Sequence, residues 1–448
     1  MYLNETHAKK WAPVLDHPEL PRISDPYKRA VTALVLENQE RALMEDARAT
    51  QNLWEAGSVA GGGLPNNMDG PAGLSSGAGG IKGFDPILIG LVRRALPNLM
   101  AYDICGVQPM TGPTGLIFAM RSVYASATAR AGEALYDEAN NAHSGNGTMT
   151  AFSSSVNPGN ANSSIFGLAN TGFGFSTTFG ESANLAQMGF QIDRVAVTAN
   201  TRGLQASYTL ELAQDLKAIH GLDAETELTN ILSTEILAEI NREVVRTVYA
   251  TANVGIVGET SNTFNLNSTD TTAGGTSGRW QVEKYKSLLF AIERAANKIA
   301  KDTRRGKGNI LILSTDVASA LAMTGLLDYN SALTNNTNLV VDDTGNTFAG
   351  TLFGRIKVYV DPYSVSNSDY VIVGYKGTNA YDAGLFYCPY VPLQMVRAID
   401  PQTYQPKVGF KTRYGLVANP FATGAGTGVL ANNTNYYYRK FQVLNINQ

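Results

Sequence analysis

The chain has 448 residues, a formal net charge of −3 and only 16% charged residues, with both signs interspersed. This length exceeds one ordinary compact domain, and the near-neutral charge does not favour a surface that grips nucleic-acid phosphates. Cys105 and Cys388 are the only cysteines, which excludes a disulfide framework and a four-cysteine metal site. We expect a soluble chain, because no apolar run approaches the ~20 residues of a membrane-spanning helix and the first residues lack a secretory signal.

The sparse charge leaves two interpretations open. A surface with few charged residues stays soluble when neighbouring subunits cover much of it, which favours an oligomer. The same composition also fits a monomer with long loops of glycine, asparagine and serine.

Residues 1–55 are more densely charged than the rest, with seven Lys or Arg and nine Asp or Glu. From Asp25 to Trp54 the residues favour a helix, with Asp25 and Pro26 suited to the N-cap and the first helical position. Asn38–Arg41 interrupts the apolar stripe, so the pattern fits one helix or two. The segment is either an ordinary helix packed on its own core or a detachable one that binds a partner.

Residues 56–83 change composition abruptly, with ten glycines, two prolines and only two charged residues. This composition predicts an extended arm or linker. A short apolar helix is expected next, around Pro86–Ala95.

Two β-prone segments flank a long uncharged stretch. Val107–Arg121 holds a Gly/Pro turn that leads into a strand, and Gly189–Ala199 shows partial two-residue alternation. No Asp, Glu, Lys or Arg occurs from Ala139 to Gly180. We expect the two strands to pair while the stretch between them projects.

The most regular segment is Asp223–Tyr249, whose apolar residues recur at three- and four-residue steps. It predicts a helix of roughly 40 Å. A second helix is expected at Trp280–Ala300 and a third near Asp316. The later strands are expected at Asn309–Leu313, Ile356–Val360, Tyr370–Val373, Leu385–Tyr387 and Met395–Ile399. Long helices mixed with strands that do not alternate as βαβ units predict an α+β fold.

The sequence contains no motif that supports catalysis, and it predicts no catalytic, cofactor-binding or metal-binding residue. Arg304–Gly308 resembles a phosphate loop only in containing Gly and Lys, and it precedes a strand rather than following one. A solvated loop or a contact to a neighbouring subunit is the favoured interpretation. His220 is expected to be a turn residue. The pairs Glu225/Glu227 and Glu239/Glu243 are interpreted as solvated or subunit-facing helix positions.

Three segments resemble a known family in the same order along the chain. Phe84–Arg121, Leu210–Val245 and Tyr375–Pro420 are similar to the mature N-terminal region, the spine-helix region and the C-terminal strands of T-even-type phage major capsid proteins. With the stretches between them, the resemblance covers most of the chain after residue 80. It implies the Hong Kong 97-type capsid fold.

The resemblance also implies a division of the chain. A helical propeptide that binds scaffold would occupy 1–55, and a Gly-rich arm would follow at 56–85. A peripheral domain with the spine helix would comprise 86–106 and 210–250, and an extended loop at 107–209 would carry an insert at about 122–188. Residues 251–385 would form most of an axial domain, and the C-terminal strands at 386–448 would return to the peripheral domain. The insert is shorter than the inserted domain that T-even-type proteins carry there. We therefore expect it to be loop-like or a small β unit.

The implied function is structural, with hexamers of the chain tiling an icosahedral head around double-stranded DNA that is bound without sequence specificity. The implied partners are neighbouring capsomers, a vertex capsid protein, an internal scaffold protein, a prohead protease, the portal and decoration proteins. An encapsulin-like compartment of the same fold and a soluble oligomeric hydrolase are the alternatives.

The resemblance finally implies a cleavage site. Prohead proteases of the T-even type cut after Glu in a Leu/Ile-x-Glu pattern, usually before a small residue. The pattern occurs at four glutamates, Glu5, Glu45, Glu55 and Glu239. Only the site formed by Leu53, Glu55 and Ala56 has a small residue next and lies between the charged segment and the Gly-rich one. We expect cleavage between Glu55 and Ala56.

Overall fold

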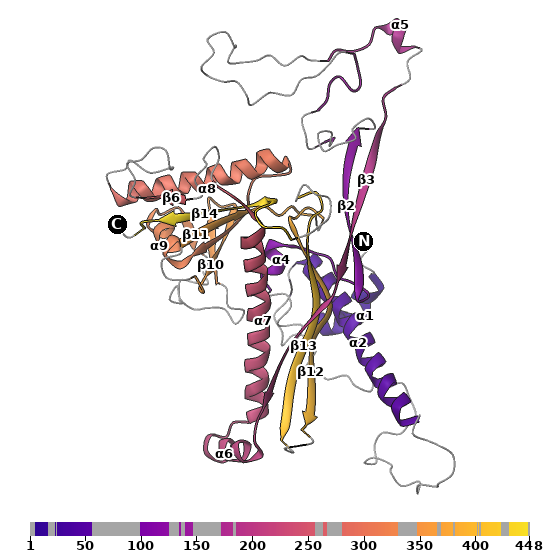
Figure 1. Ribbon diagram of the computed structural model, residues 1–448, viewed down its shortest axis with the longest axis vertical. Helices are drawn as coiled ribbons and strands as arrows, with labels where there is room; N and C mark the ends of the chain where they lie inside the picture. Colours follow the sequence, from indigo (N-terminus) through magenta and orange to yellow (C-terminus); the bar gives the residue numbers. More distant parts are fainter. Residues whose placement is uncertain are drawn as a thin grey trace.

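A computed structural model of the protein shows helices and three separate sheets (Figure 1). It describes residues 5–16, 23, 25–55, 99–124, 134–135, 139–146, 172–181, 185–255, 263–266, 280–329, 347–364, 369–379, 381–400, 402, 405–422 and 430–446. The α+β class predicted from the sequence is confirmed. The predicted arm at 56–83 and the predicted helix at Pro86–Ala95 lie outside the described residues.

The longest helices lie at the N-terminus and in the middle of the chain. Helix α7 (Ala224–Thr251) has 28 residues and so spans about 42 Å, which confirms the long helix predicted at Asp223–Tyr249. Its buried apolar residues include Ile236, Val244 and Val248, whereas Ile231 of the predicted stripe is 61% exposed. Helix α6 (Leu210–His220) precedes it and has no buried residue. Helix α1 (Glu5–Leu15) was not expected, and α2 (Pro26–Glu55) is one continuous helix rather than two.

The first sheet has four strands in the order β1-β12-β13-β4 and packs against α7. Its strands are β1 (Gly106–Val107), β12 (Leu385–Ile399), β13 (Pro406–Ala418) and β4 (Asn200–Ser207). Strand β12 unites two strands that the sequence predicted separately. Pro389 and Pro392 lie between those halves, where the pairing with β13 shifts register. Because proline cannot donate to a ladder, it is tolerated at such irregularities.

The second sheet has eight strands, with the main order β5-β14-β11-β7-β10-β9-β8 and β6 beside β14. Its strands are β5 (Ala252–Val254), β6 (Thr263–Asn265), β7 (Ile310–Ser314), β8 (Leu327–Tyr329), β9 (Thr347–Leu352), β10 (Ile356–Asp361), β11 (Asp369–Gly374) and β14 (Asn435–Leu444). Helices α8 (Gln281–Thr303) and α9 (Thr315–Met323) pack on it, near the positions predicted for them. Strand β14 was expected to return with β12 and β13 to the peripheral domain. It pairs with β11 of the eight-stranded sheet, while the division of the chain into domains stays a prediction.

The third sheet is the hairpin of β2 (Thr114–Tyr124) and β3 (Met188–Thr198), which projects from the body of the molecule (Figure 1). Its pairing confirms that the strands flanking the uncharged stretch come together. Within the predicted insert, the structure describes α5 (Thr177–Gly180) and a bridge between Asn146 and Phe173. The rest of the 122–188 prediction falls mostly outside the described residues. Helix α4 (Ala101–Ile104) leads into β1.

Candidate assembly surfaces

The two faces of the β2–β3 hairpin differ because alternate side chains of a strand point to opposite sides. Near its base, Ile117, Val195 and Val197 are buried in a cluster with Phe386 and Val417 of the first sheet. This contact anchors the hairpin to the body. The side chains between these positions point to the other face.

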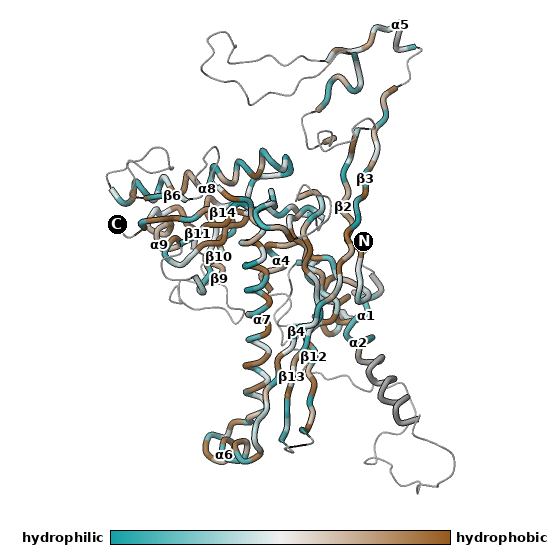
Figure 2. Tube along the Cα trace, viewed as in Figure 1, coloured by the Kyte–Doolittle hydropathy of each residue, from teal (hydrophilic) through white to brown (hydrophobic). Residues whose placement is uncertain are grey.

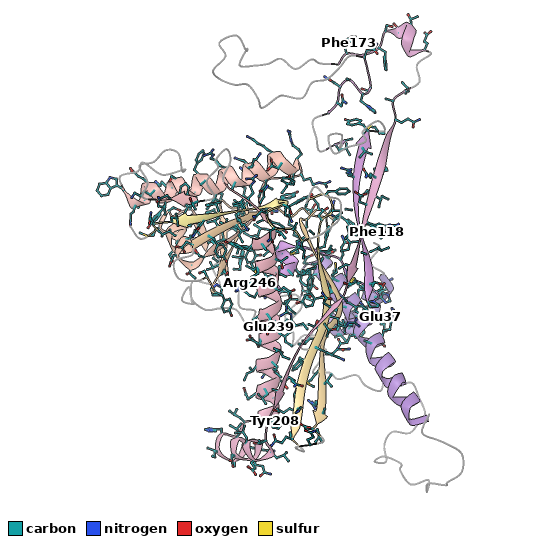
Figure 3. The ribbon with its side chains drawn as sticks, viewed as in Figure 1. Glu37, Phe118, Phe173, Tyr208, Glu239 and Arg246 are labelled. Carbon is teal, nitrogen blue, oxygen red and sulfur yellow. The ribbon has the colours of Figure 1, made fainter. Side chains whose placement is uncertain are left out.

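That other face is exposed and mostly apolar. Three residues of β2 and three of β3 on it are apolar and 48–75% exposed: Leu116, Phe118, Met120, Met188, Phe190 and Ile192. Met120 and Ile192 are direct partners across the ladder, whereas Phe118 faces Arg194 and Phe190 faces Ser122. We call the six apolar residues the hairpin face. Figure 2 shows hydrophobic stretches along the projecting hairpin, and Figure 3 labels Phe118 on it. A mostly apolar exposed surface of this kind marks an interaction site.

A groove of about 580 Å³ lies between the hairpin and the body. The hairpin lines it with Phe118, Met120 and Phe190, and the body lines it with residues that include Tyr381 and Phe421. Arg121, Arg305 and Asp382 also line it, and Arg305 lies 3.5 Å from Asp382, so the groove combines apolar contact with an ion pair. The groove adds to the apolar surface that the hairpin offers.

The N-terminal helices α1 and α2 are packed into the body. Trp11, Leu15, Val31 and Val35 are at most 4% exposed and belong to the main core cluster, which also contains residues of α4, α7 and β12. Of the two interpretations offered for this segment, the structure therefore shows a helix packed on the core of its own chain. That packing by itself does not prevent later detachment.

Two polar side chains of α2 bind backbone carbonyls at the edge of the first sheet. The Tyr27 hydroxyl donates to the Val107 carbonyl, and the Asn38 amide donates to the carbonyls of Met110 at 2.8 Å and Tyr390 at 3.2 Å. Burial raises the pKa of Tyr27 to about 12. The sequence interpretation took Asn38 as an interruption of the apolar stripe. The position of Asn38 in the middle of an apolar stripe was the sequence signal that its side chain binds a buried polar group.

The same interface contains a buried amide without a hydrogen-bond partner. Gln39 is 2% exposed, and neither its nitrogen nor its oxygen has a partner among the described residues. A buried polar group left in this way costs on the order of 1–3 kcal/mol. Thr32, Asn38 and Glu40 are buried nearby on α2. The contact between α2 and the body thus buries these polar groups beside fully buried apolar side chains such as Val31, Val35 and Leu36.

One ionic cluster joins α7 to the first sheet. Arg202 of β4 donates to Glu239 at 2.9 Å and to Glu243 at 2.6 Å, and Tyr414 of β13 donates to Glu243. Burial opposes the charge of Arg202, but its hydrogen bonds to Glu239 and the neighbouring groups outweigh this and raise its pKa. Glu239 and Glu243, which were expected to be solvated or subunit-facing, are thus paired within the chain, while their side chains remain 32% and 36% exposed. Their partner lies on a strand that the sequence did not predict. Figure 3 labels Glu239 on α7.

A second ionic cluster joins α7 to the larger sheet. Asp361 at the end of β10 is fully buried and accepts hydrogen bonds from Arg242 of α7 and from the Tyr370 hydroxyl of β11. The backbone N–H of Tyr363 also donates to it, at 3.0 Å. Helix α7 is thus held by charged groups to both sheets, which makes it the junction of the body.

The other residues considered for chemistry do not form a site. Lys307 pairs with Glu293, and Arg305 lies 3.5 Å from Asp382, so the basic loop pairs within the chain. His220 ends α6. Among the described residues there is no group of three or more His, Cys, Asp or Glu that could hold a metal ion, and no helix is long and apolar enough to cross a membrane.

The residues predicted for cleavage lie at a helix end. Leu53 and Glu55 occupy the last turn of α2, which ends at Glu55. Ala56 lies outside the described residues. The described part of α2 thus reaches the predicted cleavage position, and the cleavage itself stays a prediction.

Comparison with known proteins gives consistent matches over most of the chain. The family model of the major capsid protein Gp23 matches residues 81–443. The major capsid protein of Salmonella phage ViI is 39% identical over 464 residues, which cover 98% of this chain and 97% of that protein. The major capsid protein of Enterobacteria phage T4 is 36% identical over 485 residues, which cover 93% and 92%.

Among solved structures, the capsid of Myoviridae phage XM1 is 10% identical, with a TM-score of 0.37 over 76% of this chain and 90% of that chain. The family model and the near-full-length identities decide the assignment. They confirm the α+β capsid fold of Hong Kong 97 type that the sequence resemblance implied. The chain belongs to the family of the major capsid protein Gp23, and it is a structural protein of the virion rather than an enzyme.

Proposed function

We propose that copies of this chain assemble as hexamers, and that the hexamers close an icosahedral head around double-stranded DNA. The observation that carries this proposal is the hairpin face, whose six apolar side chains are 48–75% exposed on a hairpin that projects from the body (Figure 1). Apolar surface of that kind is stabilised when a neighbouring subunit covers it. The net charge of −3 suits an inner wall that does not hold DNA tightly.

The remaining partners belong to the same proposal. A vertex capsid protein would complete the corners of the head, and an internal scaffold, a prohead protease and the portal would act during assembly. Decoration proteins would bind the outer surface. Within the subunit, α7 with the first sheet would form the peripheral domain, and the eight-stranded sheet, with β14 included, the axial domain.

We further propose that residues 1–55 are removed by cleavage between Glu55 and Ala56 during maturation of the head. One observation supports this: the contact between α2 and the body buries the unpaired amide of Gln39 among the described residues. Because α1 and α2 share the main core, the cut must be followed by their release from it.

The cleavage proposal is tested by replacing Glu55→Gln in the virus and measuring the N-terminal peptide of virion subunits by mass spectrometry. Wild-type subunits should begin at Ala56, and the variant should retain residues 1–55. Glu45→Gln is the matched control, because Glu45 also ends a Leu-x-Glu sequence inside α2, and it should leave the Ala56 end unchanged. Wild-type virion subunits that begin at Met1 or at any other residue would refute the site.

A further inference from the structure

A pocket of about 440 Å³ lies where the start of α2 meets α4 and the eight-stranded sheet. Its walls come from α2, α4, the strands β7 and β10, and the loop that follows β11. Six charged side chains line it, of which four are cationic: Lys28, Arg355, Lys357, Lys376, Asp25 and Asp103. A concave site with an excess of one sign of charge attracts ions of the opposite sign.

Asp103 of α4 is a carboxylate that several groups of this pocket share. Its Oδ1 atom lies 3.3 Å from Nζ of Lys28 and 3.7 Å from Nζ of Lys357, so the two ammonium nitrogens are within about 7 Å of each other. The Tyr359 hydroxyl also forms a hydrogen bond with Asp103. Each ammonium group has three N–H donors, so one carboxylate leaves most of them without a charged acceptor.

The other two charged groups of the lining have partners elsewhere. Arg355 pairs with Glu293 of α8. The carboxylate of Asp25 accepts the backbone N–H of Tyr27 at 2.9 Å, at the start of α2. The three lysines therefore decide what the pocket can bind.

Lys376 is fixed in the wall of the pocket by its backbone. Its N–H donates to the side-chain oxygen of Asn309 at 3.0 Å, and the Asn309 amide donates to its carbonyl at 2.7 Å. Its ammonium group donates to the backbone carbonyl of Tyr102. Burial is the main cause that lowers the pKa of Lys376, and the nearby ammonium groups of Lys28 and Lys357 lower it further. These lysines thus concentrate more positive charge than the pocket neutralises by itself.

We propose that the pocket binds a free phosphate ion, which accepts hydrogen bonds from Lys28, Lys357 and Lys376. A phosphate carries several acceptor oxygens on one small ion, so it can bind ammonium groups that come from different elements at the same time. Each such charge-assisted bond is about 2.8 Å long, which one phosphate can make to two nitrogens held this close. A single-atom anion such as chloride lacks the separate oxygens.

The position of Lys28 makes this ion a tie between two parts of the chain. Lys28 belongs to α2, whereas Lys357 and Lys376 belong to β10 and to the loop after β11 of the eight-stranded sheet. A ligand that binds only while α2 is in place stabilises that arrangement by mass action. The inference concerns the full-length chain and does not rest on cleavage after Glu55.

Binding is tested by isothermal titration of inorganic phosphate into the full-length chain, with sodium chloride keeping the ionic strength constant. Phosphate should bind saturably, and Lys357→Met and Lys376→Met should each raise its Kd about tenfold or more, because each removes a charge-assisted hydrogen bond. The side chain of Lys357 is 54% exposed, so this variant keeps the fold even where Lys376→Met does not. Lys411→Met is the matched control, since Lys411 is exposed on β13 outside the pocket, and its Kd should equal that of the parent.

The tie is tested by hydrogen–deuterium exchange of peptides that cover residues 26–35 of α2. Phosphate at ten times its Kd should slow exchange there about tenfold, because each opening must first release the ion. Lys28→Met should abolish this slowing, whereas Lys411→Met should show the same slowing as the parent.

The absence of saturable binding, or an equal Kd in the parent, Lys357→Met and Lys376→Met, would overturn the phosphate site. Chloride that competes as well as phosphate at equal concentration would overturn it too, because the pocket would then respond to any anion. A DNA duplex that displaces phosphate from the parent, and binds more weakly to Lys357→Met, would show that these lysines contact nucleic acid instead. Phosphate that binds without slowing the exchange of α2 would overturn the tie.

Discussion

The body around α7 and the β2–β3 hairpin differ in whether their apolar and charged side chains find partners within the subunit. In the body, apolar residues such as Ile236 and Val244 are fully buried, and the charged groups of α7 find partners on both sheets. In the hairpin, Phe118 and Phe190 are 48% and 75% exposed. The α7 junction therefore finds its partners within one subunit, whereas the hairpin face leaves its apolar side chains exposed, and we propose that another subunit covers them. Substitutions in the two regions should therefore separate folding from assembly.

The largest effect is expected at the buried carboxylate of the body. Arg242→Met removes the cation beside Asp361, which is fully buried, and should lower the free energy of unfolding by about 3–5 kcal/mol because an uncompensated buried charge remains. Urea denaturation of the dispersed subunit measures this. Arg246→Met is the control, since Arg246 lies one turn away on the exposed side of α7 (Figure 3) and should change stability by no more than about 0.5 kcal/mol. A similar loss of unfolding free energy in both variants would show that the unpaired charge of Asp361 does not cause it.

A smaller effect on folding and a decisive one on assembly are expected in the hairpin. Phe190→Asp should change the free energy of unfolding of the subunit by about 0.5 kcal/mol or less, because the side chain is exposed. It should nevertheless abolish shells in sedimentation, because a charge would be buried without a partner at the contact. Gln187→Asp, at an exposed position just before β3, should leave shells intact. Normal shells from Phe190→Asp would remove the hairpin face from the assembly contacts.

The sequence predicted the helices and strands whose formation depends on the local pattern of apolar and polar residues. The three- and four-residue recurrence from Asp223 to Tyr249 predicted α7, and the two-residue alternation around Val195 predicted the hairpin strand. The sequence also placed a cleavage motif at Glu55, where α2 ends. Each of these signals lies within one short window of the chain.

The features that the sequence did not predict depend on partners distant in the chain. Glu239 and Glu243 were expected to face solvent or a neighbour because nothing local identifies Arg202, 37 residues away from Glu239, as their partner. Strand β14 was expected with β12 and β13, and nothing in the local sequence indicates its pairing with β11. Asn38 was taken as a break because its carbonyl partners lie at Met110 and Tyr390.

An effect that depends on pH is expected at the contact between α2 and the backbone carbonyls of Val107 and Met110. Burial, with Tyr381 and Asp25 nearby, raises the pKa of Tyr27 to about 12 from its ordinary 10.0. The unfolded chain therefore loses this proton first. The stability that Tyr27 contributes is fully present below about pH 10 and is lost as pH rises through about 12.

Fluorescence of Trp11, which is 4% exposed on α1, measures this effect once Trp54 and Trp280 are replaced by phenylalanine. At neutral pH, Tyr27→Phe should weaken the seating of α1 and α2 by about 1 kcal/mol, the value of one hydrogen bond. The difference between the parent and Tyr27→Phe should shrink between pH 10 and pH 12. A difference that stays constant over that range would show that the Tyr27 proton does not control the contact.

The most direct test of the account is a cryo-electron microscopy map of assembled shells, with attention to the hairpin face. We predict that Phe118, Phe190 and the other four residues of this face are buried against a neighbouring copy of the chain, while the body keeps the α7 junction with Arg202 and Asp361 described above. A map in which the hairpin face remains open to solvent, or folds back on its own subunit, would contradict the claim that another subunit completes the hairpin.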